Sequence, residues 1–326
     1  MIEFARGGAV SARAESSGSA GSITLRGAEK VTLSSGAAVT AETTGRGQAG
    51  SISFEDVAQI ELSDAAITTQ TEAVTEDPAR TGGAITIAGG DTLILVDGAL
   101  ITSQTSGTDD GGQIAISTVT GVGLASGSTI SSESTGSGDA GDISIDAGLV
   151  FESRNSFVTT QADIAFGGSI SITAKDLIYP LNSEITTRVQ AGVGDGGNIT
   201  LDPRFVVING SQIIASAIGG NGGNITITGD DVLISGDTTV DASSQLGISG
   251  TIAISSPDTS LIAGLVRLPE TFLDASSQLE RSCSARTARA GSLVVRGRDR
   301  IPASPDAPLR GFYMGGGQPS SPATVN

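Results

Sequence analysis

The hexapeptide Gly222-Gly223-Asn224-Ile225-Thr226-Ile227 is one copy of a pattern that recurs about every 29 residues. A typical copy has a small residue or glycine, then glycine, one polar residue and an apolar-x-apolar triplet. The other copies are AGSITL (20–25), AGSISF (49–54), GGAITI (82–87), GGQIAI (111–116), AGDISI (140–145), GGSISI (167–172), GGNITL (196–201) and the worn SGTIAI (249–254). Successive second-position glycines lie 26 to 33 residues apart. A repeat of this length predicts a solenoid, in which each unit packs on its neighbours.

Each repeat unit contains three short strand-like pieces. In residues 82–110, Ile85 and Ile87 alternate with Thr86, which is the period of a strand with one buried face. We expect the second and third strands at residues 93–96 and 100–102. Residues 103–110 are expected to form a polar excursion that leads to the next repeat.

Glycine-containing turns are expected between these strands. Gly82-Gly83 is predicted to take positive φ at a tight turn, and Gly89-Gly90-Asp91 and Asp97-Gly98 to end the first and second strands. Residues 71–81 form the longest variable loop in the pattern. Asn198 and Asn224 occupy the same slot of successive repeats, and we expect them to stack as a short amide ladder.

These features predict an all-β fold, a right-handed parallel β-helix with three sheets, about 29 residues per coil and a C-terminal cap. The identical isoleucines of successive coils are expected to stack in a dry column. A leucine-rich repeat would need an L-x-x-L-x-L-x-x-N frame, which is absent. A β-propeller would need a longer period and a blade signature such as Trp-Asp, whereas the chain has no tryptophan.

Three regions are predicted along the chain: β-helix repeats over 1–256 with an incomplete N-terminal coil, a cap segment over 257–310 and a disordered tail over 311–326. Five of the ten prolines lie between Pro302 and Pro322, where the repeat is lost. Because the chain begins in the middle of the pattern, we expect it to be the C-terminal part of a longer protein. No stretch is long and apolar enough to predict a membrane-spanning helix.

The charge of the chain argues against nucleic acid as a partner. The formal net charge is −17, and residues 1–280 alone carry 33 acidic and 11 basic residues. Phosphates would be repelled by such a body. Residues 281–326 carry seven arginines and two aspartates. We interpret this segment as a cap that pairs with the acidic body or, alternatively, as an anchor to an anionic envelope polymer.

Little in the sequence indicates catalysis. The chain has no histidine, which excludes histidine-based acid–base chemistry and imidazole metal sites, and its single cysteine, Cys283, excludes an internal disulfide. We therefore assign no catalytic, cofactor-binding or metal residues and no cofactor. A Ca²⁺-stabilised module stays open as an alternative, because several turn acids could meet when the turns stack. These are Asp109, Asp110, Asp139, Asp142, Asp195, Asp230 and Asp231.

The repeats and the C-terminal segment resemble filamentous-haemagglutinin-like exoproteins of two-partner secretion, particularly the cyanobacterial branch. The repeats G-G-N-I-T-I and G-G-S-I-S-I resemble the β-helical shaft of that family. The more specific likeness is in residues 265–270 (LVRLPE), 273–279 (LDASSQL) with Cys283, 291–298 (GSLVVRGR) and 301–305 (IPASP). Leu293 and Asp299-Arg300 depart from the phenylalanine and the glycine pair of the family's usual ending.

The resemblance implies a secreted or cell-surface protein associated with the outer membrane. Its full-length parent would be exported by an outer-membrane β-barrel partner, which recognises an N-terminal secretion domain that is not in this sequence. The expected function is a non-enzymatic adhesin-like shaft with a cell-adhesion or spacer role, whose partners are glycans or other cell surfaces. The alternative is a carbohydrate-active enzyme, a polysaccharide lyase or hydrolase on the same scaffold.

Overall fold

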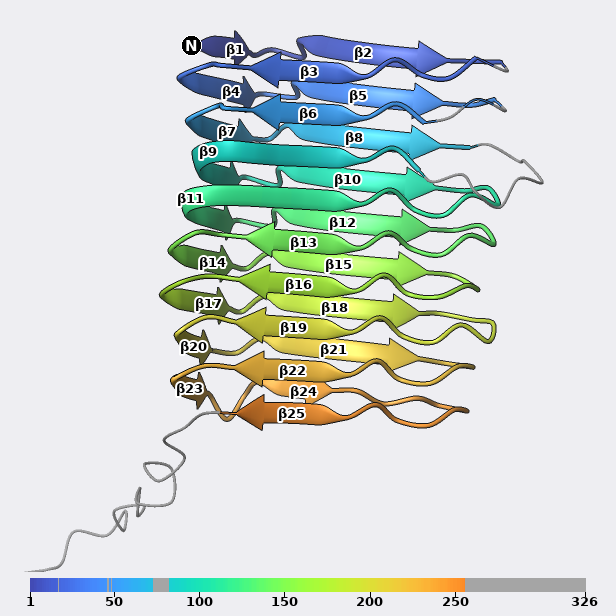
Figure 1. Cartoon of the computed structure of the whole chain (residues 1–326), viewed down its shortest axis with the longest axis vertical. Coiled ribbons are helices and arrows are strands. Elements are labelled where there is room, and N and C mark those ends of the chain that lie inside the picture. The colour runs from blue at the N-terminus through green and yellow to red at the C-terminus, as the bar shows by residue number, and fades with distance from the viewer. Residues whose placement is uncertain (17, 46, 48, 73–81, 256–326) are drawn as a thin grey trace, which may run out of the picture. The chain divides into compact units, whose positions relative to one another are not determined.

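The structure is a computed structural model that describes residues 1–255 except 17, 46, 48 and 73–81. Its described part is an all-β parallel solenoid of about 29 residues per coil, and no helix occurs in it (Figure 1). Every strand pairing in this part is parallel, and each strand, except those at the ends of the stacks, pairs with its equivalents one coil before and one coil after. The predicted parallel β-solenoid is confirmed; the predicted cap and tail lie outside the described residues.

The strands form three stacks that run the length of the solenoid, one for each strand position in the coil. Stack 1 contains β3 (Ile23–Arg26), β6 (Ile52–Glu55), the first part of β9 (Ile85–Val96) and of β11 (Ile114–Ala125), β13 (Ile143–Asp146), β16 (Ile170–Thr173), β19 (Ile199–Asp202), β22 (Ile225–Thr228) and β25 (Ile252–Ser255). Stack 2 contains β1 (Ile2–Phe4), β4 (Lys30–Ser34), β7 (Gln59–Ser63), the second part of β9 and β11, β14 (Val150–Arg154), β17 (Leu177–Leu181), β20 (Phe205–Ile208) and β23 (Asp231–Ile234). Stack 3 contains β2 (Ala9–Ala14), β5 (Ala38–Thr43), β8 (Ala66–Thr71), β10 (Leu100–Thr105), β12 (Thr129–Ser134), β15 (Phe157–Ala162), β18 (Glu184–Val189), β21 (Gln212–Ala217) and β24 (Thr239–Asp241).

The predicted break between the first and second strands is wrong in two coils. β9 and β11 each run through it as one continuous strand of 12 residues, with register shifts beside Thr118. Stacks 1 and 2 are therefore joined into one 16-stranded sheet, whereas stack 3 is a separate nine-stranded sheet. Gly89 takes φ of 76° within β9 and lets the chain bend there without leaving the sheet.

The core is a column of aligned apolar side chains, as the repeat predicts. In register along stack 1, Ile52, Ile85, Ile114, Ile143, Ile170, Ile199 and Ile225 are all buried. Burying each such side chain contributes about 2 kcal/mol. A single coil buries too few of them to offset its backbone entropy, so the coils are stable only when stacked.

Candidate functional site

Successive coils approach one another very closely at the glycine-pair turn, which joins stack 3 to stack 1. From Gly50 to Gly250, a Cβ atom built on the second glycine would lie 1.9–2.3 Å from the carbonyl oxygen of the equivalent glycine in the preceding coil. Gly82 and Gly83 do not take positive φ, so the predicted reason for this pair is wrong. Glycine is required because successive backbones approach too closely for any side chain.

Hydroxyl groups from stack 3 satisfy the buried glycine carbonyls at this corner. Thr69 and Ser103 both donate to the carbonyl oxygen of Gly83, at 2.7 and 3.2 Å, and Thr187 donates to that of Gly197 at 2.6 Å. The predicted third strand is too short for the same reason: β10 continues to Thr105, and Ser103 and Thr105 are buried rather than part of a polar excursion. A buried hydroxyl is tolerated where it has a backbone acceptor.

Two ladders of polar side chains flank the glycine pairs on the outside. Ladder A occupies the position two before the second glycine and consists of Asp110, Asp139, Asp195 and Asn221, whereas Phe166 and Ile248 hold the same position in two other coils. The Oδ1 atom of Asp139 accepts the backbone N–H of Phe166 at 2.9 Å, and that of Asp195 accepts the N–H of Asn221 at 2.7 Å. Each oxygen therefore caps the turn of the following coil.

Ladder B occupies the position immediately after the second glycine and repeats this geometry. Asp142 accepts the N–H of Ser169 at 2.7 Å, and the hydroxyl of Ser169 accepts that of Asn198 at 3.2 Å. Asn198 in turn accepts from Asn224 at 2.8 Å, and Asn224 from Thr251 at 2.9 Å. The expected stacking of Asn198 on Asn224 is present, but the bonds join side-chain oxygen to backbone amide rather than amide to amide.

The acids considered as Ca²⁺ ligands are distributed among other roles. Asp110, Asp139, Asp142 and Asp195 belong to the two ladders, and Asp230 lies 3.3 Å from the Nε of Arg204 in an ion pair. Asp109 is buried in the turn, and Asp231 begins β23. Among the described residues, no group of three His, Cys, Asp or Glu side chains is placed to hold a metal ion.

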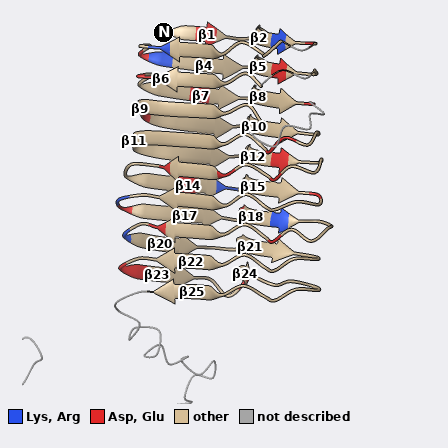
Figure 2. Ribbon diagram, turned by 45° about the vertical axis from the view of Figure 1, so that its right-hand side comes forward, with Lys and Arg blue, Asp and Glu red and all other residues tan. Residues whose placement is uncertain are grey.

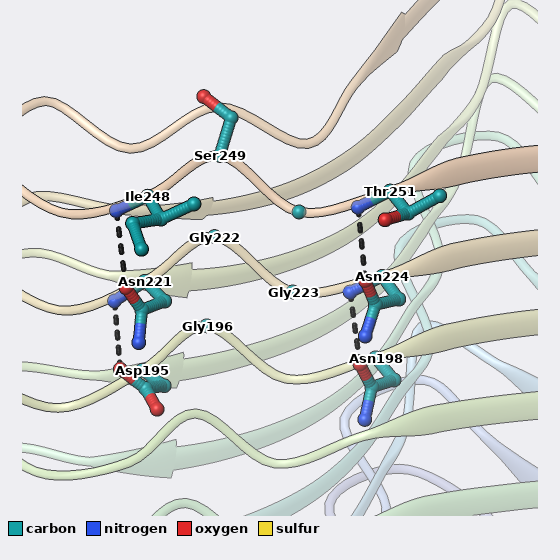
Figure 3. Close-up of a pocket in the computed structure, with 11 residues that line it drawn as sticks. Asp195, Gly196, Asn198, Asn221, Gly222, Gly223, Asn224, Ile248, Ser249 and Thr251 are labelled. Atoms are coloured by element: carbon teal, nitrogen blue, oxygen red, sulfur yellow. Dashed lines mark hydrogen bonds between the residues drawn. The ribbon is translucent and has the colours of Figure 1, made fainter.

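The ladders border a shallow trough of about 480 Å³ at the C-terminal end of the described coils (Figure 3). Its floor is the backbone of Gly196, Gly222, Gly223 and Gly250, and the side chain of Ser249 stands between the ladders in the last of these coils (Figure 3). Its lining consists of Asp195, Gly196, Asn198, Asn221, Gly222, Gly223, Asn224, Ile248, Ser249, Gly250 and Thr251. The trough was not predicted from the sequence, although the recurrence of Asp or Asn on both sides of Gly-Gly at 195–198 and 221–224 is a signal for it.

The polar ends of the trough residues are available to a ligand. Asn198, Asn221 and Asn224 use Oδ1 to cap the next coil, and within the described part of the chain their Nδ2 groups make no hydrogen bond to the protein. Figure 3 shows the two ladders on either side of the glycine turns, with each cap bond crossing from one coil to the next. The trough thus presents three amide donors and the second carboxylate oxygen of Asp195.

Phe166 interrupts ladder A one coil before Asp195. Phe166 is 53% exposed, and its side chain has no oxygen to accept the backbone amide of the next coil. Phe166 occupies this slot in the coil before Asp195, about 4.8 Å along the solenoid, and so lies next to the residues that line the trough without being one of them. Ile248, in the same slot two coils after Asp195, is likewise apolar and exposed, so ladder A has an apolar residue on each side of Asp195 and Asn221.

Charged residues are spread thinly over the outer faces of the strands (Figure 2). Arg26 donates from Nε to the Glu55 carboxylate at 2.8 Å, and this bond, with a further one from Ser53, lowers the pKa of Glu55. The pKa of Asp237 is lowered by the hydroxyl of Ser235 and by backbone amides. Neither carboxyl resembles a general acid of glycoside cleavage, which needs a raised pKa.

Comparisons with protein-family models, with curated proteins and with solved structures find no match. The resemblance to filamentous-haemagglutinin-like exoproteins therefore stays a prediction from the sequence. No helix in the described residues is long and apolar enough to span a membrane.

Proposed function

We propose that this chain is the non-enzymatic β-helical shaft of a secreted, adhesin-like exoprotein that holds a contact surface away from the cell. The observation that carries the proposal is the uniform stack of coils, joined in parallel register along three strand stacks. Such a solenoid grows in length without a central cleft. Its regularity suits a spacer better than a catalyst, which needs a local departure in which acid and base groups converge.

The glycine-pair turn supports a stiff shaft. Because the second glycine leaves no space between coils, adjacent coils are already at their closest approach at this corner. The ladders on either side of it add hydrogen bonds that join each coil to the next. Close packing and inter-coil hydrogen bonds at the same corner both resist changes in coil spacing, as a stiff shaft requires.

The outer face of stack 3 supports weak, repeated contacts. Thr40 and Thr68 align across β5 and β8, and Ser131 and Thr159 align across β12 and β15. Such a face offers many small hydroxyls at the coil spacing, so a glycan or another cell surface would be held by multivalency rather than by one tight site. The proposed location is extracellular, at the cell surface and associated with the outer membrane, after export of the full-length parent by its outer-membrane partner.

Two measurements test this proposal, one on the purified chain and one on whole cells. Incubation with a panel of neutral and acidic polysaccharides should release no new reducing ends or unsaturated products; clear bond cleavage would refute the non-enzymatic shaft and favour the lyase or hydrolase alternative. Surface labelling of cells that express the full-length parent should detect the repeats outside the cell. Labelling that requires cell lysis would remove the adhesive role.

A further inference from the structure

The trough between ladders A and B carries an inference that rests on the proposed function and names its ligand. We propose that the trough binds an uncharged glycan chain laid along the solenoid axis, with Phe166 as the stacking platform at its N-terminal end.

The polar groups of the trough match the chemistry of sugar hydroxyls. Asn198, Asn221 and Asn224 present Nδ2 donors, and Asp195 presents a carboxylate acceptor. These groups form two parallel rows, and successive members of each row lie one coil apart. A saccharide hydroxyl both donates and accepts, so adjacent hydroxyls pair with an amide and a carboxylate together. The coil spacing of about 4.8 Å is close to the length of one sugar ring along an extended chain, so successive rings meet successive coils.

The glycine floor gives such a chain access. Gly196, Gly222 and Gly223 put no side chain between the ladders, and Ser249 in the last coil adds only a hydroxymethyl group there (Figure 3). The trough is open and shallow, which suits a polymer that lies along it better than a small molecule that must be enclosed. The acidic character of the chain, with a net charge of −17, disfavours an acidic polysaccharide.

Phe166 is the independent observation that points to a ligand. A capping side chain at this position would accept the backbone amide of Asp195, as Asp195 accepts that of Asn221. Phe166 cannot make this bond, and the residue is 53% exposed. The flat apolar face of a sugar ring packs well on an exposed aromatic ring. Binding sites often contain residues that reduce the stability of the fold but are needed for function.

The first experiment is isothermal titration of the full chain with hexasaccharides of β-1,4-glucan, β-1,4-mannan, α-1,4-glucan and β-1,4-linked N-acetylglucosamine, and with an oligogalacturonate of equal length. We expect at least one uncharged hexasaccharide to bind and the oligogalacturonate not to bind. Phe166→Ala should weaken binding about tenfold. Phe157→Ala is the matched control, because Phe157 is also an exposed phenylalanine but lies on the outer face of β15; it should leave the affinity unchanged.

The ladder residues are tested by substitutions that keep the cap. In Asn221→Asp and Asn224→Asp the Oδ1 acceptor stays and the Nδ2 donor is lost, and Asp195 and Asp142 already occupy the same positions in other coils. We expect an unchanged melting temperature and an affinity reduced about tenfold in each variant. Phe166→Asn should restore ladder A, raising the melting temperature while weakening glycan binding.

The outcomes separate this inference from the proposed function. Absence of binding to every glycan, or binding that the Phe166 and asparagine variants leave unchanged, would overturn the trough as a glycan site and leave the shaft intact. A lower melting temperature for Phe166→Asn would show that the ring serves the fold, and would also overturn the inference. Glycan cleavage together with variant-sensitive binding would support the trough and refute the non-enzymatic shaft.

Discussion

Two corners of the coil both depend on glycine, but for different physical reasons. At the glycine-pair turn between stacks 3 and 1, Gly141 has no positive φ, and its position is closed by the carbonyl of Gly112. At the turn between stacks 2 and 3, Gly127 takes φ of 79°, and a Cβ added there would meet no atom within 4 Å. The first glycine is required by the neighbouring coil and the second by its own backbone.

The sequence follows this difference. The second position of the glycine pair is glycine in all nine repeats. The turn between stacks 2 and 3 has positive φ at Ser35, Asp64, Asp97, Asn155 and Asn182, residues that pay a modest cost for the left-handed conformation. Contact with another coil excludes every side chain, whereas a positive φ only makes some residue types more favourable than others.

The largest expected effect is that of Gly141→Ala. The new Cβ would lie 2.2 Å from the Gly112 carbonyl oxygen, so the two coils must separate or the turn must shift. We expect a loss of about 3 kcal/mol in the free energy of unfolding, measured by urea denaturation followed by circular dichroism.

Gly21→Ala is the matched control for that substitution. Gly21 occupies the same slot in the first described coil, where the nearest atom to an added Cβ is the Cβ of Ala12 at 3.7 Å. This variant should unfold at the urea concentration of the wild type. If both variants lose equal stability, the close approach of coils is not the reason for the glycine.

A smaller effect is expected from Gly127→Ala at the other corner. The added methyl group has space, so the cost is that of a left-handed alanine, about 1–2 kcal/mol. Ser126→Gly in the same turn should be neutral or slightly stabilising, because Ser126 also has positive φ, at 57°. A loss as large as that of Gly141→Ala would mean that this turn is also limited by packing.

The fold itself could be predicted from the repeat. The alternation around Ile85 and Ile87 and the turn at Asp97-Gly98 are local patterns, and the structure confirms both. The continuous strand β9 could not be predicted, because the sequence Gly89-Gly90-Asp91 is typical of a turn that ends a strand. Pairing with the coils on either side keeps this segment in the sheet.

The candidate site depended on contacts that no single repeat contains. Ser103 is a polar residue and indicates an exposed loop, yet its acceptor is a glycine carbonyl 20 residues away in sequence. The cap from Asn198 to the amide of Asn224 likewise joins two coils. Residue type and slot could be predicted, but the partner appears only when the coils are aligned in space.

Two substitutions at Asn224 test whether the side-chain oxygen is what stabilises the glycine-pair turn. Asn224→Ala leaves the N–H of Thr251 without its side-chain acceptor and should cost about 1 kcal/mol. Asn224→Asp keeps that acceptor and should leave the melting temperature unchanged. Differential scanning calorimetry of the two variants measures both, and an equal loss in both would assign the stability to the amide nitrogen instead of the oxygen.

The smallest effect concerns the turn between stacks 2 and 3 in the last described coils. The Ser235 hydroxyl donates to the carboxylate of Asp237, and this bond lowers the pKa of Asp237 below its ordinary 3.8. Because the folded-state pKa is the lower one, the carboxylate stabilises the solenoid at pH values above 3.8, and this contribution is lost as the pH falls through the lowered pKa.

Asp237→Asn should therefore lower the melting temperature slightly at neutral pH and not in strong acid. The size is small because the group is fully exposed to water. If the melting temperatures of Asp237→Asn and the wild type differ by the same amount at every pH, the carboxylate charge does not stabilise this turn. Its stability would then come from the backbone conformation alone.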